Sequence, residues 1–336
     1  MNFVPSQKIG IIGGGAWGTA LAEAYAFSKN ETLLYVRNPA LAEEINQNHE
    51  NALYLRGLPL SPSLKASSSI NSLESCDVLF LAIPAQALRT TLMDIIPFLK
   101  KKNPPLIIAA KGIEYTSGFF MSEVIQSVSP QSPFAVLSGP SFAHEVAAHY
   151  PTALTLGAQN PDLCVFLQKR LSNSILRLYT SSDILGIQIG GAIKNVIAIA
   201  AGIVIGANLG ENARASLITR SFSEMRLLGK ALGSNPETIF GLSGLGDLLL
   251  TAMSNHSRNT SLGMELGRGD DIDIILKERI NVTEGVHTAR SLRILIEKFK
   301  LDLPICTAVF SILEKKASVQ DTIDTLLSRP LKNETS

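Results

Sequence analysis

The sequence predicts an α/β fold, in which an N-terminal Rossmann-type, doubly wound parallel sheet is followed by an all-helical C-terminal domain. Three observations lead to this prediction. A glycine-rich turn, Gly13 to Gly18, stands between a short apolar run and a helix-forming run. Continuous apolar runs then alternate with helical patterns, which is typical of sheets covered on both faces. From Asp183 onward strand patterns disappear. We therefore expect two domains, residues 1–182 and 183–336.

The first predicted strand, residues 8–12, leads into the glycine turn, and a helix over residues 19–28 follows it. Strand, glycine turn and helix are the context that a G-x-G-x-x-G dinucleotide fingerprint requires. Gly13 permits the tight turn, Gly15 lets the backbone approach a pyrophosphate, and Gly18 lets the helix pack closely on the strand. The N-terminus of that helix then attracts the anion. The alternative is a turn whose glycines serve packing alone.

The second predicted strand, residues 32–36, ends in Arg37-Asn-Pro without a carboxylate. An NAD-selective site usually has an Asp or Glu at this point to hold the ribose hydroxyls. Arg37 suits a 2′-phosphate instead, so the sequence favours NADP(H) over NAD(H). The alternative for Arg37 is a solvated surface arginine.

Further apolar runs complete the predicted sheet. They cover residues 77–83, 106–110, 134–137, 152–156 and 175–179, with helices over residues 85–99 and 161–171. Ligands of doubly wound sheets bind at the carboxyl ends of the strands. Lys111 follows one of these strands and residues 138–141 follow another, so we expect both to touch one ligand. The alternatives are a surface lysine and a simple turn at Gly139-Pro140.

The second half is predicted to be helical throughout. Its helices cover residues 184–208, 213–232, 236–240, 261–268, 272–278, 284–298, 304–315 and 319–328. The first of them carries Lys194, the one ionisable side chain between Asp183 and Glu211. Loss of water lowers the pKa of a lysine, which can then exchange protons near neutral pH. The alternative is a lysine whose stem packs on the core while its head reaches solvent.

Small residues share the helix face of Lys194. Gly190 and Gly191 lie one turn before it, and Ala198 lies one turn after it. They leave room beside the ammonium group, either for a substrate or for a crossing helix.

Two later segments carry candidate partners of Lys194. The glycine-rich residues 241–247 end in Asp247, which is either a helix N-cap or the carboxylate that orients the lysine. The polar loop of residues 254–259 ends in Arg258-Asn259, where a guanidinium beside an amide suits a phosphate monoester. The alternative for this loop is a solvated surface segment.

The composition argues against several other classes of protein. A net charge of +1 with 18% charged residues does not suggest a nucleic-acid-binding or disordered chain. Cys76, Cys164 and Cys306 lack C-x-x-C spacing, so we expect reduced packing residues of a cytoplasmic protein and no metal site. The apolar residues 196–207 are too few to span a membrane. Residues 1–8 are too polar for a secretory signal.

Taken together, the motifs resemble those of one family. They are GGGAWGTALA from Gly13, AKG from Ala110, SGPSFA from Ser138, GGAIKNVIAIAAG from Gly190, GANLGENARASLITR from Gly206, GLSGLGDLLLT from Gly241 and SRN from Ser257. In this order, and along nearly its whole length, the chain is similar to the bacterial soluble NAD(P)-dependent glycerol-3-phosphate dehydrogenases.

The resemblance implies a reversible reduction of dihydroxyacetone phosphate to sn-glycerol 3-phosphate, which supplies glycerophospholipid synthesis. Lys194 aligns with the family's catalytic lysine, Lys111 with a second lysine at the reacting centre, and Asp247 with the carboxylate beside it. The implied substrate contacts are Lys111, Gly139, Ser141, Lys194, Asp247, Ser257, Arg258 and Asn259. The expected cofactor contacts, with the glycine turn included, are Gly13, Gly15, Ala16, Trp17, Gly18, Arg37, Lys111, Ala143, Arg258 and Glu284. Position 141 is often Thr in the family, and Ser keeps the hydroxyl group.

In the expected mechanism Lys194 is the general acid, and Lys111 stabilises the developing oxyanion and lowers the pKa of Lys194. Arg258 and Asn259 hold the phosphate, and binding there orients the carbonyl. The resemblance also implies a homodimer formed through the helical domain.

Two other functions fit part of the sequence. A β-hydroxyacid or 6-phosphogluconate-type dehydrogenase also joins a Rossmann domain to a helical domain with a Lys-Asn pair, but the SRN and GLGD segments favour the glycerol phosphate substrate. A non-catalytic dinucleotide sensor needs the glycine turn, but it has no need for Lys194, Asp247 or Arg258.

Overall fold

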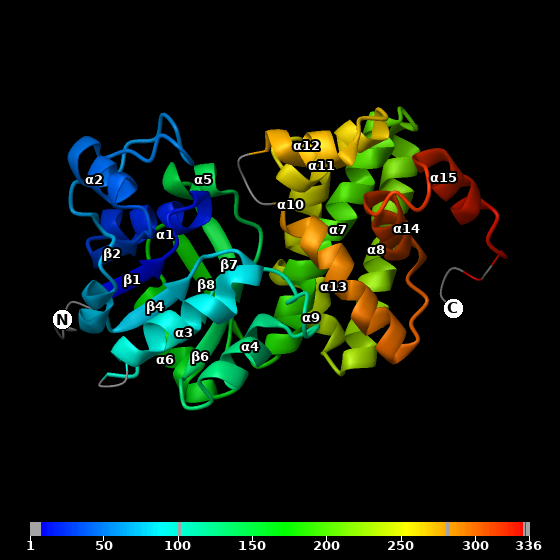
Figure 1. The fold of residues 1–336 in the computed structure, drawn as a ribbon. Helices are drawn as coiled ribbons and strands as arrows, with labels where there is room; N and C mark the ends of the chain where they lie inside the picture. Colours follow the sequence, from blue (N-terminus) through cyan, green and yellow to red (C-terminus); the bar gives the residue numbers. More distant parts are fainter. Residues whose placement is uncertain (1–7, 100–101, 280–282, 332, 334–336) are drawn as a thin grey trace.

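The computed structural model describes residues 8–99, 102–279, 283–331 and 333. Strands with flanking helices occupy the chain up to Ser181, and only helices follow from Ile184 (Figure 1). The predicted fold class is confirmed, while the domain boundary at residue 182 stays a prediction. Residues 1–7, which hold most of the polar N-terminal segment, lie outside the described residues.

The described strands form one eight-stranded sheet in the order β3-β2-β1-β4-β5-β6-β7-β8. Their bounds are β1 Lys8–Ile12, β2 Glu31–Tyr35, β3 Lys65–Ser67, β4 Val78–Leu81, β5 Leu106–Ile108, β6 Phe134–Ser138, β7 Thr152–Gly157 and β8 Leu176–Ser181. Strands β1 to β6 run parallel to one another, and β8 runs parallel to β7. The carboxyl ends of β1, β4, β5 and β6 therefore lie along one edge of the sheet.

The predicted parallel sheet has one exception, because β6 and β7 pair antiparallel. A parallel crossover needs a connection of a dozen or more residues that runs back along the sheet, usually as an α-helix. The helix between β6 and β7, α5 (Ala143–Ala147), has 5 residues. It is about 8 Å long, whereas a strand of this size spans about 17 Å. The chain therefore turns back at the same end of the sheet.

Helices cover both faces of the sheet. They are α1 Ala16–Phe27, α2 Pro39–Asn48, α3 Leu88–Leu99, α4 Met121–Val128 and α6 Pro161–Leu171, with 3-10 turns η1 Ile70–Ser75 and η2 Ala85–Ala87. The sequence prediction missed α2, α4, α5 and the short β3. For α2 a signal was present, since Asn38 caps the helix through the N–H of Ala40 and Pro39 occupies its first position.

The second part is a bundle around α7 (Ile184–Gly206), which lies in its middle (Figure 1). The other elements are α8 Gly210–Leu232, α9 Pro236–Phe240, the π-helical turn η3 Leu242–Gly246, α10 Asp247–Met253, α11 Arg258–Gly267, α12 Ile272–Glu278, α13 Glu284–Phe299, α14 Pro304–Leu313 and α15 Val319–Leu327.

Helix α7 has 23 residues and is long and apolar enough to cross a membrane. The expectation that its apolar run is too short is therefore wrong, because the apolar stretch extends on both sides of Lys194. However, 89% of its most apolar window is buried inside the protein, which identifies a core helix.

Helices α7 and α11 touch through their backbones along four glycines, which we call the glycine seam: Gly202, Gly206, Gly263 and Gly267. A Cβ added at Gly202 would stand 2.1 Å from the carbonyl oxygen of Thr260, and the other three positions are equally tight. Any side chain in the seam would push the two helices apart.

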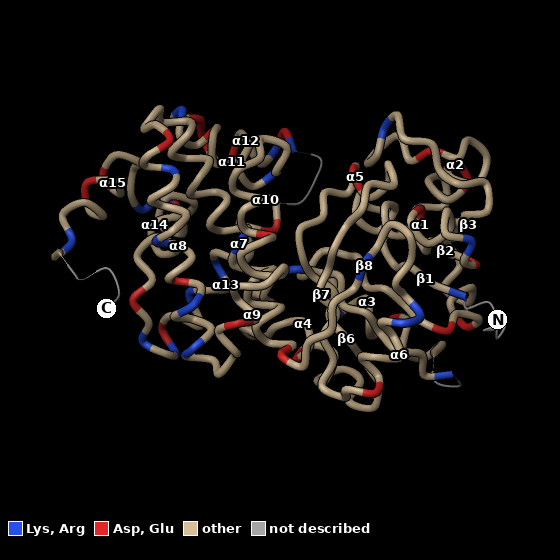
Figure 2. Tube along the Cα trace, turned by 180° about the vertical axis from the view of Figure 1, so that it is seen from behind, with Lys and Arg blue, Asp and Glu red and all other residues tan. Residues whose placement is uncertain are grey.

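The surface carries a mixture of charges. Lys and Arg residues alternate with Asp and Glu residues over both parts of the molecule (Figure 2). Cys76, Cys164 and Cys306 are buried and unpaired, as the sequence predicts.

Candidate active site

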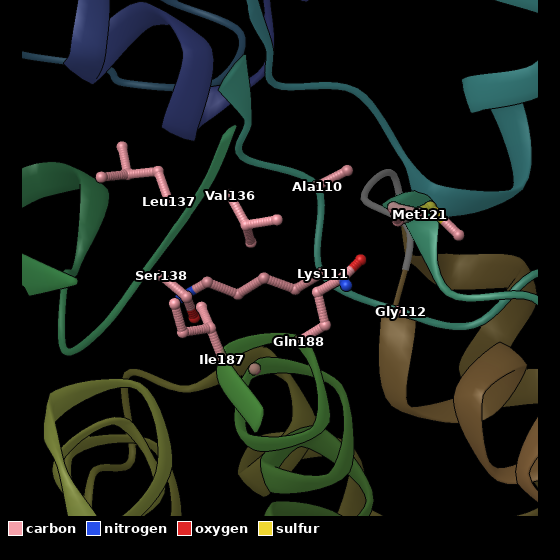
Figure 3. A pocket seen from close by; sticks show the side chains of 10 residues that line it. Ala110, Lys111, Gly112, Met121, Val136, Leu137, Ser138, Ile187 and Gln188 are labelled. Carbon is pink, nitrogen blue, oxygen red and sulfur yellow. The ribbon is translucent and has the colours of Figure 1, made fainter. Parts of the chain in front are cut away.

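The candidate site lies where the carboxyl ends of β5 and β6 face α7, η3 and α10. A narrow crevice there is lined by Lys111 and Ser138 from the strand ends and by Ile187, Gln188 and Gly191 from α7. Figure 3 shows the side chain of Lys111 crossing this crevice, with its tip beside Ser138. The structure thus brings together both predicted strand-end segments, as expected for a sheet of this topology.

Asp247 is the centre of the site. Its Oδ1 accepts a hydrogen bond from Lys194 Nζ at 2.6 Å, and its Oδ2 accepts one from Lys111 Nζ, also at 2.6 Å. The Asp247 side chain is only 1% exposed. Asp247 is the first residue of α10, but its carboxylate is directed to the lysines instead of capping the helix. Of the two interpretations of Asp247, the structure therefore supports the partner of Lys194.

Lys194 is buried along its whole length, with 8% of its surface exposed, so it does not reach solvent. Burial lowers the pKa of Lys194 from its usual 10.5 to about 8. Asp247 opposes this shift, whereas the positive charge of Lys111 adds to it. Lys194 Nζ also donates to Thr251 Oγ1 at 2.9 Å. An ammonium group has three N–H bonds, so the geometry leaves a third for a ligand.

Lys111 is held by the backbone of the β6 turn. Its Nζ donates to the carbonyl oxygen of Gly139 at 3.2 Å, and Ser141 Oγ donates to the same oxygen at 3.0 Å. Gly139 has a φ of +143°, which favours glycine. The Lys111 side chain is 17% exposed, so it is not a solvated surface lysine.

The small residues beside Lys194 serve the packing of the protein itself. A Cβ at Gly190 would stand 2.3 Å from the carbonyl oxygen of Ser243 in η3. A Cβ at Gly191 would stand 2.8 Å from Ser138 Oγ. Of the two alternatives, close approach of neighbouring chain segments therefore accounts for both glycines.

The segment around Arg258 differs from the predicted loop, because α11 begins at Arg258 and not at Ser261. Ser257 is its N-cap, and Ser257 Oγ accepts the N–H of Thr260 at 3.2 Å. Arg258 and Asn259 are therefore the first two residues of a helix, where main-chain N–H groups and the helix dipole favour an anion. Burial lowers the pKa of Arg258 below its usual range, and the carboxylate of Glu284 opposes the shift.

The carboxamide of Asn259 is directed into the protein. Its Oδ1 accepts the N–H of Gly285 at 3.0 Å, and its Nδ2 donates to Asn195 Oδ1 at 2.9 Å. It thereby joins α7, α11 and α13. Sequence reasoning gave Asn195 and Thr251 no role, although Thr251 lies one turn after Asp247 and Asn195 directly follows Lys194.

Glu284 connects the helical part to the sheet part. Its Oε1 accepts the N–H of Ala85, which follows β4, at 3.2 Å. Burial raises the pKa of Glu284 to about 7, against the opposing effects of this hydrogen bond and of Arg258. Glu284 Oε2 is buried without a hydrogen-bond partner among the described residues.

The glycine turn has the geometry expected of a dinucleotide site. Gly13 has a φ of +121°, and a Cβ at Gly18 would stand 1.9 Å from the carbonyl oxygen of Gly13. By contrast, apart from Gly15 and its two chain neighbours, no atom of the described chain lies within 4 Å of the place where a Cβ of Gly15 would stand. The turn is thus tight where strand and helix meet and open where a pyrophosphate would approach.

The other expected cofactor contacts surround this turn or border the cleft. Ala16 and Trp17 are the first residues of α1, and Trp17 Nε1 is a buried donor without a partner among the described residues. Ala143 begins α5 and is partly buried, while Arg37 is exposed just beyond β2. These positions fit a bound dinucleotide.

Comparison with known proteins indicates one family. The family model for the NAD-dependent glycerol-3-phosphate dehydrogenase N-terminus matches residues 8–164, and that for the C-terminus matches residues 183–324. The chain is 47% identical to glycerol-3-phosphate dehydrogenase (NAD(P)+) of Rhodospirillum rubrum, over 98% of this chain and 94% of the relative. It is 46% identical to that of Zymomonas mobilis, over 98% and 95%.

Solved structures agree with these relatives. Glycerol-3-phosphate dehydrogenase from Coxiella burnetii has a TM-score of 0.92 at 34% identity, over 97% of this chain and 100% of the other. A ketopantoate reductase from Ralstonia eutropha has a TM-score of 0.62 at 14% identity, over 92% and 98%, which is a likeness of fold alone.

Proposed function

The chain belongs to the NAD-dependent glycerol-3-phosphate dehydrogenase family, and on this premise we propose the role of each residue at its site. It is an NAD(P)-dependent oxidoreductase that interconverts dihydroxyacetone phosphate and glycerol 3-phosphate. The observation that supports the proposed roles is the carboxylate of Asp247 between two lysines, at the edge where the sheet meets α7.

Lys194 is the proton donor to the C2 oxygen of the ketone, and the bound nicotinamide supplies the hydride. With its pKa lowered to about 8 by burial, the ammonium group gives up a proton far more readily than an exposed lysine does. In the oxidative direction the neutral amine accepts the proton from the alcohol. The buried position also excludes water from the proton transfer.

Lys111 and Asp247 prepare this transfer. The charge of Lys111 stabilises the oxygen as it becomes negative. Asp247 holds both ammonium groups with one carboxylate, so that their N–H bonds have fixed directions. Thr251 accepts a second bond from Lys194 and so restricts the rotation of the ammonium group.

The substrate phosphate binds at the N-terminus of α11, where Arg258 and main-chain N–H groups provide positive charge. Because the carboxamide of Asn259 already bonds Asn195 and Gly285, the contribution of Asn259 is its main-chain N–H and the alignment of Asn195. The phosphate then lies on α11 and the carbonyl beside α7, so binding energy at one end orients the other.

One assay tests the overall function. Purified protein should oxidise NADPH or NADH with dihydroxyacetone phosphate and not with 2-keto acids, and it should not reduce NADP+ or NAD+ with 6-phosphogluconate. A non-catalytic sensor would bind the coenzyme without oxidising it. Equal activity on dihydroxyacetone phosphate and unphosphorylated dihydroxyacetone would reject the phosphate site.

The phosphate site itself is tested by Arg258→Ala, with Arg268→Ala as a matched control. Arg268 follows the other end of the same helix and is exposed. Loss of a charge-assisted pair costs about 2–5 kcal/mol when it is desolvated, so the KM for dihydroxyacetone phosphate should rise by at least about 30-fold. The control should leave it within about twofold, and equal effects of both changes would contradict the site.

Coenzyme selection is proposed to depend on Arg37, which favours NADP(H) because its charge pairs with a 2′-phosphate. Its exposed position beyond β2 leaves the guanidinium accessible to the coenzyme. Arg37→Asp should shift the ratio of kcat/KM values toward NADH. A wild-type protein that already prefers NADH strongly would contradict this role.

Three further expectations stay predictions. They are a homodimer formed through the helical part, a cytoplasmic location, and supply of glycerol 3-phosphate to glycerophospholipid synthesis. Sedimentation equilibrium tests the first and cell fractionation the second. Depletion of the protein should make growth dependent on added glycerol 3-phosphate if the third is right.

A further inference from the structure

A buried asparagine far from the reacting lysines contacts the glycine turn. Asn51 lies in the loop between α2 and β3 and has 0% of its surface exposed. Its Nδ2 donates to the carbonyl oxygen of Gly14 at 2.9 Å and to Thr19 Oγ1 at 2.8 Å. One acceptor belongs to the glycine turn and the other to the beginning of α1, so this single amide group links the turn to the helix.

The orientation of the Asn51 carboxamide is fixed by its other end. Asn51 Oδ1 accepts the main-chain N–H of Tyr54 at 3.3 Å, so the NH2 group faces Gly14. Its hydrogen bonds determine this assignment, because the reversed amide would put a donor against the Tyr54 N–H.

The loop that carries Asn51 is anchored to α1 a second time. Ser61 donates its N–H and its hydroxyl group to the two carboxylate oxygens of Glu23, at 2.6 Å and 2.7 Å. Glu23 is a buried residue of α1. The loop is thus tied to the same helix at both ends, which restricts the movement of Asn51 relative to the glycine turn.

The contact of Asn51 with the Gly14 carbonyl also affects the N–H of Gly15, because the two groups belong to one peptide bond. In a trans peptide the C=O and the N–H point in opposite directions. A donor that fixes the Gly14 carbonyl therefore also fixes the N–H of Gly15, which points to the side away from Asn51. Gly15 is the residue of the turn beside which the described chain leaves open space.

We propose that Asn51 is a positioning residue of the cofactor site, which holds the peptide between Gly14 and Gly15 so that the Gly15 N–H donates to the pyrophosphate of the dinucleotide. The proposal depends on the proposed function, in which the glycine turn binds the dinucleotide. Asn51 acts through the backbone and has no contact with the substrate.

The test is the dissociation constant of NADPH, measured by titration of its fluorescence, in wild-type protein and in Asn51→Leu. The leucine has a similar size but cannot donate. The dissociation constant should rise about tenfold, which equals one lost hydrogen bond of about 1.4 kcal/mol. At saturating NADPH, kcat and the KM for dihydroxyacetone phosphate should stay within about twofold, since Asn51 bonds none of the residues assigned to the substrate.

Asn46→Leu is the matched control. Asn46 also bonds the backbone through its carboxamide, with Nδ2 and Oδ1 each 2.9 Å from main-chain atoms of Ala66, but it does so between α2 and β3. Its substitution removes a similar pair of hydrogen bonds in the same region and should leave the dissociation constant of NADPH within about twofold of the wild-type value.

A double substitution separates positioning from general loosening of the fold. Thr19→Val removes one acceptor of Asn51 and should raise the dissociation constant about threefold, in keeping with partial loss of a shared hydrogen-bond group. Because both residues act on the same peptide, Asn51→Leu with Thr19→Val should bind NADPH no more weakly than Asn51→Leu alone.

An unchanged dissociation constant in folded Asn51→Leu protein overturns the proposal. If that variant does not fold, Asn51→Ala replaces it, because it removes the donor for Gly14 without adding bulk or a titratable group. Gly15→Val distinguishes a wrong role for Asn51 from a wrong proposed function. NADPH binding that survives Gly15→Val rejects the turn as the cofactor site, whereas binding lost in Gly15→Val and kept in Asn51→Leu rejects the role of Asn51 alone.

Discussion

Lys194 and Asp247 form a buried ion pair, with 2.6 Å between Nζ and Oδ1. The same carboxylate bonds Lys111, so two positive charges share one negative charge in the interior. This arrangement keeps Lys194 in place without compensating its charge fully. Burial lowers the pKa of Lys194 to about 8, and the shared carboxylate opposes this only in part, so the lysine can transfer a proton near neutral pH.

Replacing Lys194 with Met should lower turnover by roughly 100-fold or more, the usual effect of removing a general acid. Met suits the apolar interior, and Asp247 keeps Lys111 as a partner, so the variant should fold. The dissociation constant of NADPH should be unchanged, because its site is formed mainly by the sheet part. Steady-state kinetics and a fluorescence titration measure both quantities.

Lys194→Arg completes that test. Arginine keeps the positive charge but hardly releases a proton at neutral pH. Near-normal turnover in this variant would mean that the charge of Lys194 matters and that the proton comes from another group. Turnover of Lys194→Met within a few-fold of wild type would exclude a catalytic role altogether.

The two directions of the reaction should respond oppositely to pH. Reduction of the ketone needs the ammonium form of Lys194, so its kcat/KM should fall as the pH rises through about 8. Oxidation of the alcohol needs the neutral amine, so its kcat/KM should rise over the same range. Initial rates at substrate concentrations below KM between pH 6 and pH 10 check this, and parallel profiles in both directions would count against Lys194.

Asp247→Asn should move that inflection to lower pH. The negative charge of Asp247 raises the pKa of Lys194, while Lys111 lowers it. Without the carboxylate, the lowering effects of burial, Lys111 and Arg258 remain. Reduction at neutral pH should then fall at least tenfold, as less of the acid is protonated and Lys111 loses its partner. A profile with an unshifted inflection would show that Asp247 does not influence the titrating group.

A second pH effect concerns stability and Glu224. This buried residue of α8 accepts the N–H groups of Ile305 and Cys306 in the first turn of α14, at 2.7 Å and 3.0 Å. Burial nevertheless raises the pKa of Glu224 from 4.5 to about 7. The folded state thus holds a proton that the unfolded chain releases, so this contribution to the free energy of unfolding falls as the pH rises from 4.5 to 7.

Glu224→Gln should remove this dependence, because the amide does not titrate. Relative to the variant, wild-type protein should lose about 3 kcal/mol of unfolding free energy between pH 4.5 and pH 8. Thermal melting of both proteins across this range measures the difference. Glu237→Gln, at an exposed position of α9, is the control and should melt in parallel with wild type.

Much of the fold could be predicted from the sequence because its signals are local. The glycine turn, the apolar strands and the long apolar helix each have a pattern that a short window contains. The direction of β7 has no such pattern, since it depends on the short α5. The prediction also missed α4, whose eight residues are fewer than a recognisable helix pattern usually spans.

The candidate site likewise has features that the sequence predicts and features that it does not. Lys194, Lys111 and Asp247 could be proposed from their types and places, and the structure brings their side chains together. The inward direction of the Asn259 carboxamide could not be predicted, because its partners Asn195 and Gly285 lie far along the chain on other helices. The contact of Asn51 could not be predicted either, because its partner is a backbone carbonyl and leaves no pattern in the sequence.

The glycine seam has a consequence for the substrate. It fixes α11, which carries Arg258, against α7, which carries Lys194, by contact between main chains that no side-chain rotation can relax. With Arg258 and Lys194 in their proposed roles, the fixed spacing of the two helices would set the distance between the substrate phosphate and the carbonyl, and we expect it to match the three-carbon chain of dihydroxyacetone phosphate. A ketose phosphate with one more carbon between these groups should be reduced far more slowly. Selection for longer substrates would have to change the backbone spacing, because enlarging individual side-chain pockets would leave it intact.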